Sequence, residues 1–253
     1  MKYDTLPSSV GSYLKLNEVY EVLELFRRHD PQVVKEKVIR DNVLDYNTTD
    51  RRRRVLWAVK RSFLSFRSNW RERLFLETIE SLEEAAKREV LFYRLCRRSF
   101  TTYRLTLDVL LPAYEDGKDY FEKKEVLEFL KTKQQTTKSA GEWTENTVEN
   151  VGSKYLTTMK KFGYLSGRQK KEINYFSPEL KSVTYTVYEL LDRGKSPKEI
   201  INSDRLKLFM LKQRDVLNYL ERIGNAGYIS FGQAGDVLEI SPTTTFRELP
   251  DAF

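Results

Sequence analysis

The chain of 253 residues has little of the chemistry that cross-links a fold or holds a metal: one cysteine, Cys96, and one histidine, His29. A single cysteine cannot form an internal disulfide, and no Cys and His cluster of zinc-binding spacing occurs. No stretch approaches the roughly 18 apolar residues of a membrane span, and residues 1–14 lack the pattern of a signal peptide. The sequence therefore predicts a cytoplasmic protein without a metal site.

The motifs of common enzyme classes are also missing. The chain contains no Gly-x-x-x-x-Gly-Lys-Ser/Thr loop, no Gly-x-Gly-x-x-Gly after a strand and no Gly-x-Ser-x-Gly. His29 lies at the end of a predicted helix, where an imidazolium suits the helix dipole, and Cys96 lies in a helical pattern without a histidine nearby. We predict no catalytic residue, no cofactor, no small-molecule substrate and no enzymatic activity.

Positive charge is abundant and unevenly placed. Residues 48–104 contain 15 Lys and Arg against 7 Asp and Glu, whereas residues 141–253 contain 16 against 15. A basic region of this kind meets nucleic acid, an acidic face of another protein, or only solvent. Composition alone leaves the three alternatives open.

The first part of the chain reads as helical throughout. Asn17 can cap a first amphipathic helix, Pro31 opens a second, and further helical patterns reach about residue 112, with a break predicted over 112–117. One more helix ends in QQTTKSAG, residues 134–141, a polar segment without apolar anchors. We therefore predict a basic all-helical bundle over 1–139 and a separate region over 140–253.

The second region contains a repeated pattern. FGYLSGRQKKEINYFSP, residues 162–178, returns 64 residues later as AGYISFGQAGDVLEISP, residues 226–242, and each copy follows a helical pattern. Helix, tight Gly-Tyr turn and hairpin is the layout of the last helix and wing of a winged helix-turn-helix. The predicted fold class is thus mainly α, a helical bundle followed by two winged-helix-like units, at about 140–180 and 181–245.

The helix expected from Thr144 to Lys161 has an apolar side and a polar side. Amide, hydroxyl and amine groups on the polar side and cations on the following hairpin suit base edges and phosphates. The predicted nucleic-acid-binding residues here are Asn146, Asn150, Ser153, Thr157, Lys160, Lys161, Arg168, Lys170 and Lys171. An alternative is that the hairpin packs against the bundle and buries this polar face. The corresponding helix in the second copy lacks this character and is expected to pack against protein.

A second candidate group consists of the consecutive arginines Arg51, Arg52, Arg53 and Arg54, which the pattern places at a helix start. Positive charge is unfavourable at a helix start, because the exposed amides there carry partial positive charge. Arginines kept at this position suggest an anion site, since helix amides and guanidinium groups both favour phosphate. Neutralisation by nearby acids, with Glu36 and Asp41 as candidates, is the alternative.

Two segments resemble the BrxA family, accessory proteins of BREX bacteriophage-defence systems. They are LNEVYEVLELFRRHDPQVVKEKVIRDNVLDYNTTDRRRRVLWAVKRSF, residues 16–63, and WTENTVENVGSKYLTTMKKFGYLSG, residues 143–167. The resemblance implies a mainly helical DNA-binding protein that supports discrimination of self from phage, encoded beside a methyltransferase, a protease-like factor and a large ATPase. The family has been labelled an inner-membrane protein, but this sequence supplies no spanning segment.

The residues and the resemblance together predict a non-enzymatic protein that binds double-stranded DNA, with other BREX proteins as further partners and no membrane association. The chief alternative is an assembly adaptor of the defence complex that binds no nucleic acid. RNA binding is a third alternative, although no aromatic-rich sheet motif for stacking unpaired bases is present.

Overall fold

The structure, a computed structural model, describes residues 2–5, 15–235 and 237–253. Helices dominate and the strands are short and antiparallel, so the predicted mainly α class is confirmed. The segment 1–14, where the sequence predicts no signal peptide, lies largely outside the described residues. The chain forms two compact units, one from residues 1–76 and 94–175 and the other from 77–93 and 176–253. The predicted division into 1–139 and 140–253 stays a prediction.

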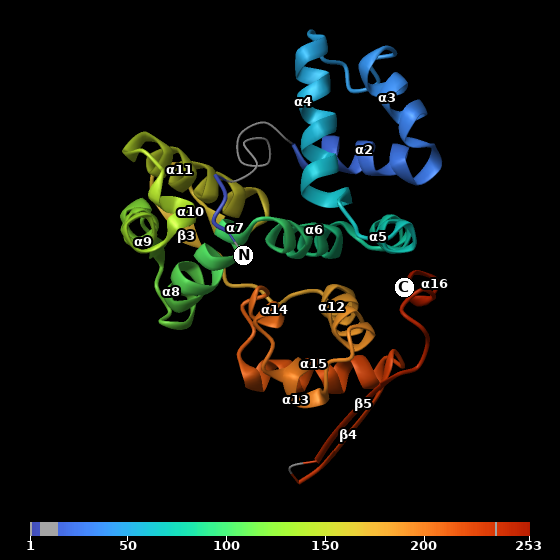
Figure 1. Cartoon of the computed structure of the whole chain (residues 1–253). Helices are drawn as coiled ribbons and strands as arrows, with labels where there is room; N and C mark the ends of the chain where they lie inside the picture. Colours follow the sequence, from blue (N-terminus) through green and yellow to red (C-terminus); the bar gives the residue numbers. More distant parts are fainter. Residues whose placement is uncertain (1, 6–14, 236) are drawn as a thin grey trace. The chain divides into compact units, whose positions relative to one another are not determined.

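The first unit begins with helices whose apolar stripes face one another, as their 3.6-residue period predicts. These are α2 (Leu16–Arg28), α3 (Pro31–Ile39) and α4 (Thr49–Val59), with α4 continuing into the π-helical turn η1 (Lys60–Leu64) (Figure 1). Val22, Val34 and Val55 are fully buried among them. The predicted cap at Asn17 is wrong: the helix starts at Leu16, two residues earlier than a cap at Asn17 would give, and Lys15 takes the N-cap position.

Two helices carry the chain into the second unit and back. The boundaries between the units fall after Leu76, inside α5 (Asn69–Ser81), and after Tyr93, inside α6 (Glu84–Arg98). The first unit then continues with α7 (Phe100–Leu105), η2 (Thr106–Leu110) and α8 (Leu111–Glu115). Pro112 lies in the first turn of α8, where its missing N–H is not needed, so the predicted break at this residue is wrong.

The rest of the first unit builds a small sheet beside helices. Its elements are β1 (Tyr120–Phe121), α9 (Lys123–Thr136), α10 (Lys138–Gly141), α11 (Glu145–Lys161), β2 (Leu165–Ser166) and β3 (Lys171–Ile173). β3 lies in the middle, with Tyr120 opposite Glu172 and Leu165 opposite Ile173. The expectation that QQTTKSAG has no apolar anchor is wrong, because Ala140 in α10 is fully buried and α10 contacts α9.

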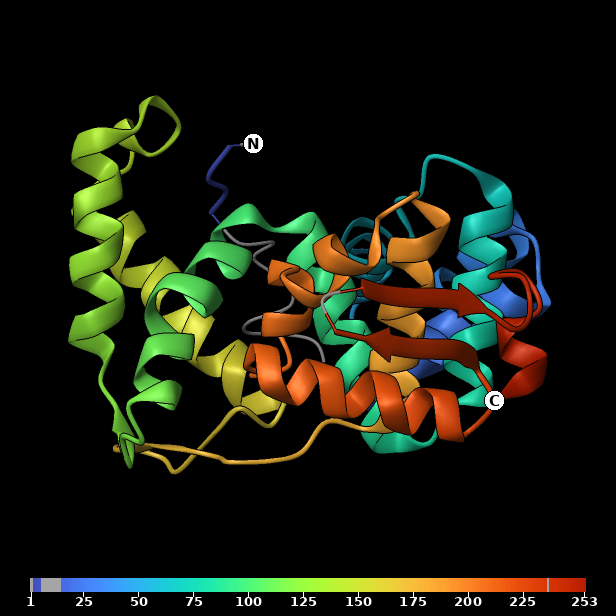
Figure 2. The ribbon, with the colours of Figure 1, turned by 90° about the horizontal axis from the view of Figure 1, so that it is seen from below.

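The second unit repeats much of this order. It contains α12 (Leu180–Asp192), α13 (Pro197–Ile201), α14 (Asp204–Lys207), α15 (Gln213–Asn225), β4 (Ile229–Ala234), β5 (Val237–Pro242) and α16 (Leu249–Ala252). The antiparallel β4–β5 hairpin runs beside α15, which contacts β4 (Figure 2). Ser241 and Pro242 end β5, whereas Ser177 and Pro178 lie beyond β3. The second hairpin is therefore longer, and the repeated Ser-Pro pair occupies different structural positions.

Candidate nucleic-acid interface

The helix α11 begins and ends where the sequence predicts. The Thr144 hydroxyl accepts a hydrogen bond from the Thr147 amide at 3.2 Å, and Gly163 ends the helix with a φ of 84°, a conformation that favours glycine. The predicted apolar side is buried, and a Cβ at Gly152 would lie 2.9 Å from the Leu127 Cδ2 of α9. Packing against α9 therefore fixes which side of α11 faces outward.

The predicted polar side faces solvent. The side chains that are exposed are those of Asn146, Asn150, Ser153, Thr157 and Lys160. Ser153 and Thr157 donate their hydroxyl protons to the carbonyls of Glu149 and Ser153, each at 2.9 Å, so their lone pairs remain available as acceptors. Burial of Asn150 and Thr157 against the bundle, the alternative raised by the sequence, is absent in this structure.

A carboxylate borders this side of the helix. Glu149 is exposed beside the polar residues and forms an ion pair with Lys123 of α9, with Nζ and Oε2 2.6 Å apart. The polar side therefore carries negative charge near its N-terminal part. The positive end of the face, around Lys160, is the part best suited to phosphate.

Lys161 differs from Lys160 in its surroundings. Its side chain is half-buried, and burial lowers the pKa of the Lys161 amine, an effect that the Glu18 carboxylate opposes and the Arg51 guanidinium reinforces. The fold thus brings Lys161 near Arg51, two candidates that are 110 positions apart in the sequence. Lys161 is thus engaged inside the protein, and Lys160 is the cation of this pair that is more accessible to a ligand.

The β2–β3 hairpin presents its cations at the turn. Gly167 has a φ of 75°, and a Cβ there would lie 2.2 Å from the Lys170 carbonyl oxygen, so the turn requires glycine. Arg168 and Lys170 are exposed, with the Lys170 amine 4.9 Å from the centre of the Tyr120 ring. Lys171 is half-buried and donates to the Arg168 carbonyl. Two of the three predicted hairpin cations are therefore free to meet a phosphate.

The arginines at the start of α4 have separate roles. Arg51 lies with its guanidinium 5.0 Å from the centre of the Tyr46 ring, and Arg52 donates to the Ile39 carbonyl at 2.6 Å. Both are half-buried and occupy the first turn, whereas Arg53 and Arg54 are exposed in the second. Arg54 pairs with Asp50 at 2.6 Å. Arg53 and Arg54 are therefore the members of this group that a ligand can reach.

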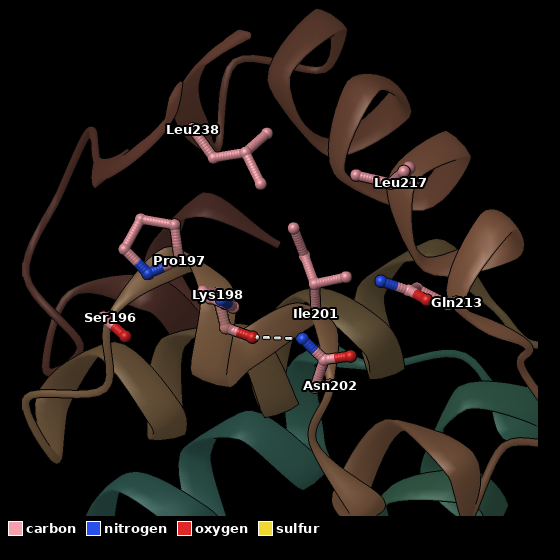
Figure 3. A pocket seen from close by; sticks show the side chains of 8 residues that line it. All are labelled: Ser196, Pro197, Lys198, Ile201, Asn202, Gln213, Leu217 and Leu238. Carbon is pink, nitrogen blue, oxygen red and sulfur yellow. Dashed lines mark hydrogen bonds between the residues drawn. The ribbon is translucent and has the colours of Figure 1, made fainter. Parts of the chain in front are cut away.

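The corresponding helix of the second unit, α15, also has an exposed side. Its exposed residues mix signs, with Arg214 and Arg222 beside Glu221. The half-buried Leu217 lines a pocket of about 540 Å³ between α13, α15 and β5, where Ile201 and Leu238 point toward the same space (Figure 3). Ser196, Lys198, Asn202 and Gln213 form the polar part of the lining. None of the predicted binding residues lies in this pocket.

Cys96 and the acidic residues are limited in their chemistry by where the described part of the chain places them. Cys96 is buried, and burial raises the pKa of its thiol well above the usual value, which suppresses the reactive thiolate. In the described part of the chain, no group of three or more His, Cys, Asp and Glu residues is placed to hold a metal ion. Across the same residues, no helix combines the length and the apolarity that a membrane crossing requires.

Comparison with known proteins gives a structure and a family. The chain is similar to the crystal structure of an uncharacterized protein from Magnetospirillum magneticum, with a TM-score of 0.58 and 12% identity over 83% of this chain and 98% of that chain. At this identity the likeness shows the fold alone, and no curated protein matches. The family model of BrxA matches residues 8–202, well over half of the sequence, and the chain therefore belongs to the BrxA family.

Proposed function

We propose that the protein is a non-enzymatic, cytoplasmic DNA-binding component of BREX phage defence, the system to which its family belongs. In this proposal α11 enters a groove of duplex DNA through Asn150, Ser153 and Thr157. Lys160, Arg168 and Lys170 contact flanking phosphates. Other BREX proteins are further partners, and the protein acts without a cofactor or small-molecule substrate.

The observation that carries the proposal is the order of elements around α11. The order is a helix (α8), a short strand (β1), three helices (α9, the four-residue α10 and α11) and a hairpin whose second strand pairs with β1. Apart from the short α10, this is the order of a winged helix. The polar side of α11 is exposed and cations stand at its C-terminal end and on the hairpin. This combination favours DNA over the adaptor function, because amide and hydroxyl groups that can contact base edges lie on the same helix as a cation that can contact a phosphate.

The second unit supports a different role. α15 and its hairpin have a similar order, but the exposed side of α15 mixes signs and borders a partly apolar pocket. We assign the second unit to contacts with another protein of the defence system, so that one chain joins DNA to its partners.

A titration of the purified chain with random-sequence duplex DNA at several salt concentrations tests the proposal. Each phosphate contact makes the slope of log affinity against log salt steeper by about 0.9, so a slope of several units is expected. A flat salt response, or no measurable binding at low salt, would favour the adaptor function instead. The same protein is expected to leave DNA uncut and ATP unhydrolysed.

A further inference from the structure

The outer side of α4 carries an exposed aromatic residue, Trp57. The Trp57 side chain is 49% exposed. The Arg61 guanidinium stands 4.9 Å from the centre of its ring, and about half of the residue's surface stays accessible to a ligand. Single exposed apolar residues are common on protein surfaces, so Trp57 alone indicates nothing. Its surroundings decide what it can bind.

Four arginines surround this residue. Arg53 and Arg61 lie four positions before and after Trp57, about 6 Å along the helix axis in each direction, and Arg54 lies beside them. Arg98, at the end of α6, donates from Nε to the Arg61 carbonyl at 3.3 Å. All four arginines are exposed. We call Arg53, Arg54, Trp57, Arg61 and Arg98 the Trp57 surface.

The backbone beneath this surface is held in place by buried contacts. At η1 the helix widens into a π turn, a feature found often at functional sites. The buried Arg94 donates to the carbonyls of Phe63 and Ser65 at 2.9 and 2.8 Å, where η1 ends. These bonds and the one from Arg98 anchor η1 to α6 within the first unit. The exposed ring and the cations are thus presented by a fixed support.

We infer that the Trp57 surface binds an unpaired nucleic-acid strand. A base stacks on the exposed part of the Trp57 ring, and phosphates on either side of the base meet the guanidinium groups. A paired base cannot do this, because its faces are covered by its neighbours in the stack and a convex helix cannot reach between them. The ligand is therefore single-stranded or locally opened, unlike the duplex proposed for α11.

An acidic protein segment fits the same surface less well. Tryptophans that dominate protein interfaces lie in dry, well-packed pockets ringed by contacts that exclude water. Trp57 is instead bordered by guanidinium groups on an outward helix side. Within the described part of the chain, Arg54 alone of the four forms an ion pair, with Asp50. Base stacking requires only one flat face, which Trp57 provides.

The experiment uses the full chain and a fluorescein-labelled 20-nucleotide oligo(dT), measured by anisotropy. Trp57→Ala is expected to weaken binding about tenfold, within the range for losing one stacked base, and to leave the salt slope unchanged because no charge is removed. Trp57→Phe keeps most of the affinity. Arg53→Ser with Arg61→Ser lowers the slope, by about 0.7 per lost phosphate contact. Tyr175→Ala, which removes another exposed aromatic of the first unit, is the matched control and binds as wild type.

A second readout is the quenching of tryptophan fluorescence by oligo(dT), which Trp57→Phe removes while Trp70 and Trp143 remain. Unchanged oligo(dT) affinity in folded Trp57→Ala overturns the inference, as does equal quenching by polyglutamate, which would assign the surface to acidic protein. The inference does not depend on duplex binding by α11. If α11 variants lose duplex binding but still bind oligo(dT), both proposed sites are supported. If the wild-type protein binds duplex but not oligo(dT), only the inference about the Trp57 surface is overturned.

Discussion

The charge at the end of α11 and on the β2–β3 hairpin offers the most direct measurement of the proposed duplex site. Lys160, Arg168 and Lys170 are exposed, whereas Lys161 and Lys171 are half-buried and engaged inside the protein. Replacing the three exposed cations with Ser removes three phosphate contacts without disturbing a buried group. The slope of log affinity against log salt should become shallower by about 2.7, at about 0.9 for each contact.

That change in slope has a size that a titration can measure. Raising salt from about 50 to about 200 mM should shrink the affinity gap between wild type and the triple variant by about 40-fold. The assay is fluorescence anisotropy with a random-sequence duplex at four or more salt concentrations. Circular dichroism and urea unfolding of each variant confirm that the fold is intact.

A matched variant separates local contacts from net charge. Lys198, Lys212 and Arg214 are exposed cations of the second unit, and replacing them with Ser removes the same total charge. This control should bind duplex nearly as wild type does. The reasoning is refuted if the first variant keeps the wild-type slope while folded, or if the control loses as much affinity as the first variant.

Two further predictions concern the first unit itself. Phe121→Ala should destabilise the protein by about 3–5 kcal/mol in urea unfolding, because Phe121 is 1% exposed in the core. Tyr120→Ala, on the opposite face of the same strand, should change stability by less than about 1 kcal/mol. Equal effects of the two substitutions would contradict the assigned register of β1. Cys96 should resist alkylation by iodoacetamide at pH 8 in the native protein and react rapidly in urea, because burial raises its thiol pKa; fast native labelling would show that this core opens.

Local sequence signals explain which parts of the fold could be predicted. The Thr144 hydroxyl and Gly163 act on residues next to them in the chain, so both ends of α11 could be predicted from the sequence. β1 could not, because its two residues are too short for a period and become a strand only by pairing with β3, about 50 residues later. α10 likewise gains its order from the burial of Ala140 beside α9.

The same distinction applies to the candidate site. Amphipathic periodicity correctly placed the outward residues of α11, since one helix is enough to separate the two sides. The number of positive charges was a poorer guide. Whether a cation can reach a phosphate depends on its contacts with other parts of the chain. Arg52 is engaged by the Ile39 carbonyl, and Lys161 is half-buried near Glu18. Trp57 is an apolar residue on the polar side of a helix, which is a weak sequence signal by itself. Its grouping with Arg98 could not be predicted, because only the fold places Arg98 beside Arg61.

The two repeated segments show how similar local sequence patterns can lead to different hairpins. Gly-Tyr followed by Leu or Ile and Ser produces the same turn twice, with Gly163 and Gly227 at φ values of 84° and 82°. The hairpins after these turns differ, because the first is short, ends in cations and gains a third strand from β1, whereas the second is longer and pairs as two strands. The first hairpin pairs with β1 and contacts α11 through β2, and its exposed cations lie on the turn that follows the C-terminal end of that helix. The turn is thus similar in both segments, but the polar helix side and the hairpin cations that suit the proposed DNA contact are found in the first.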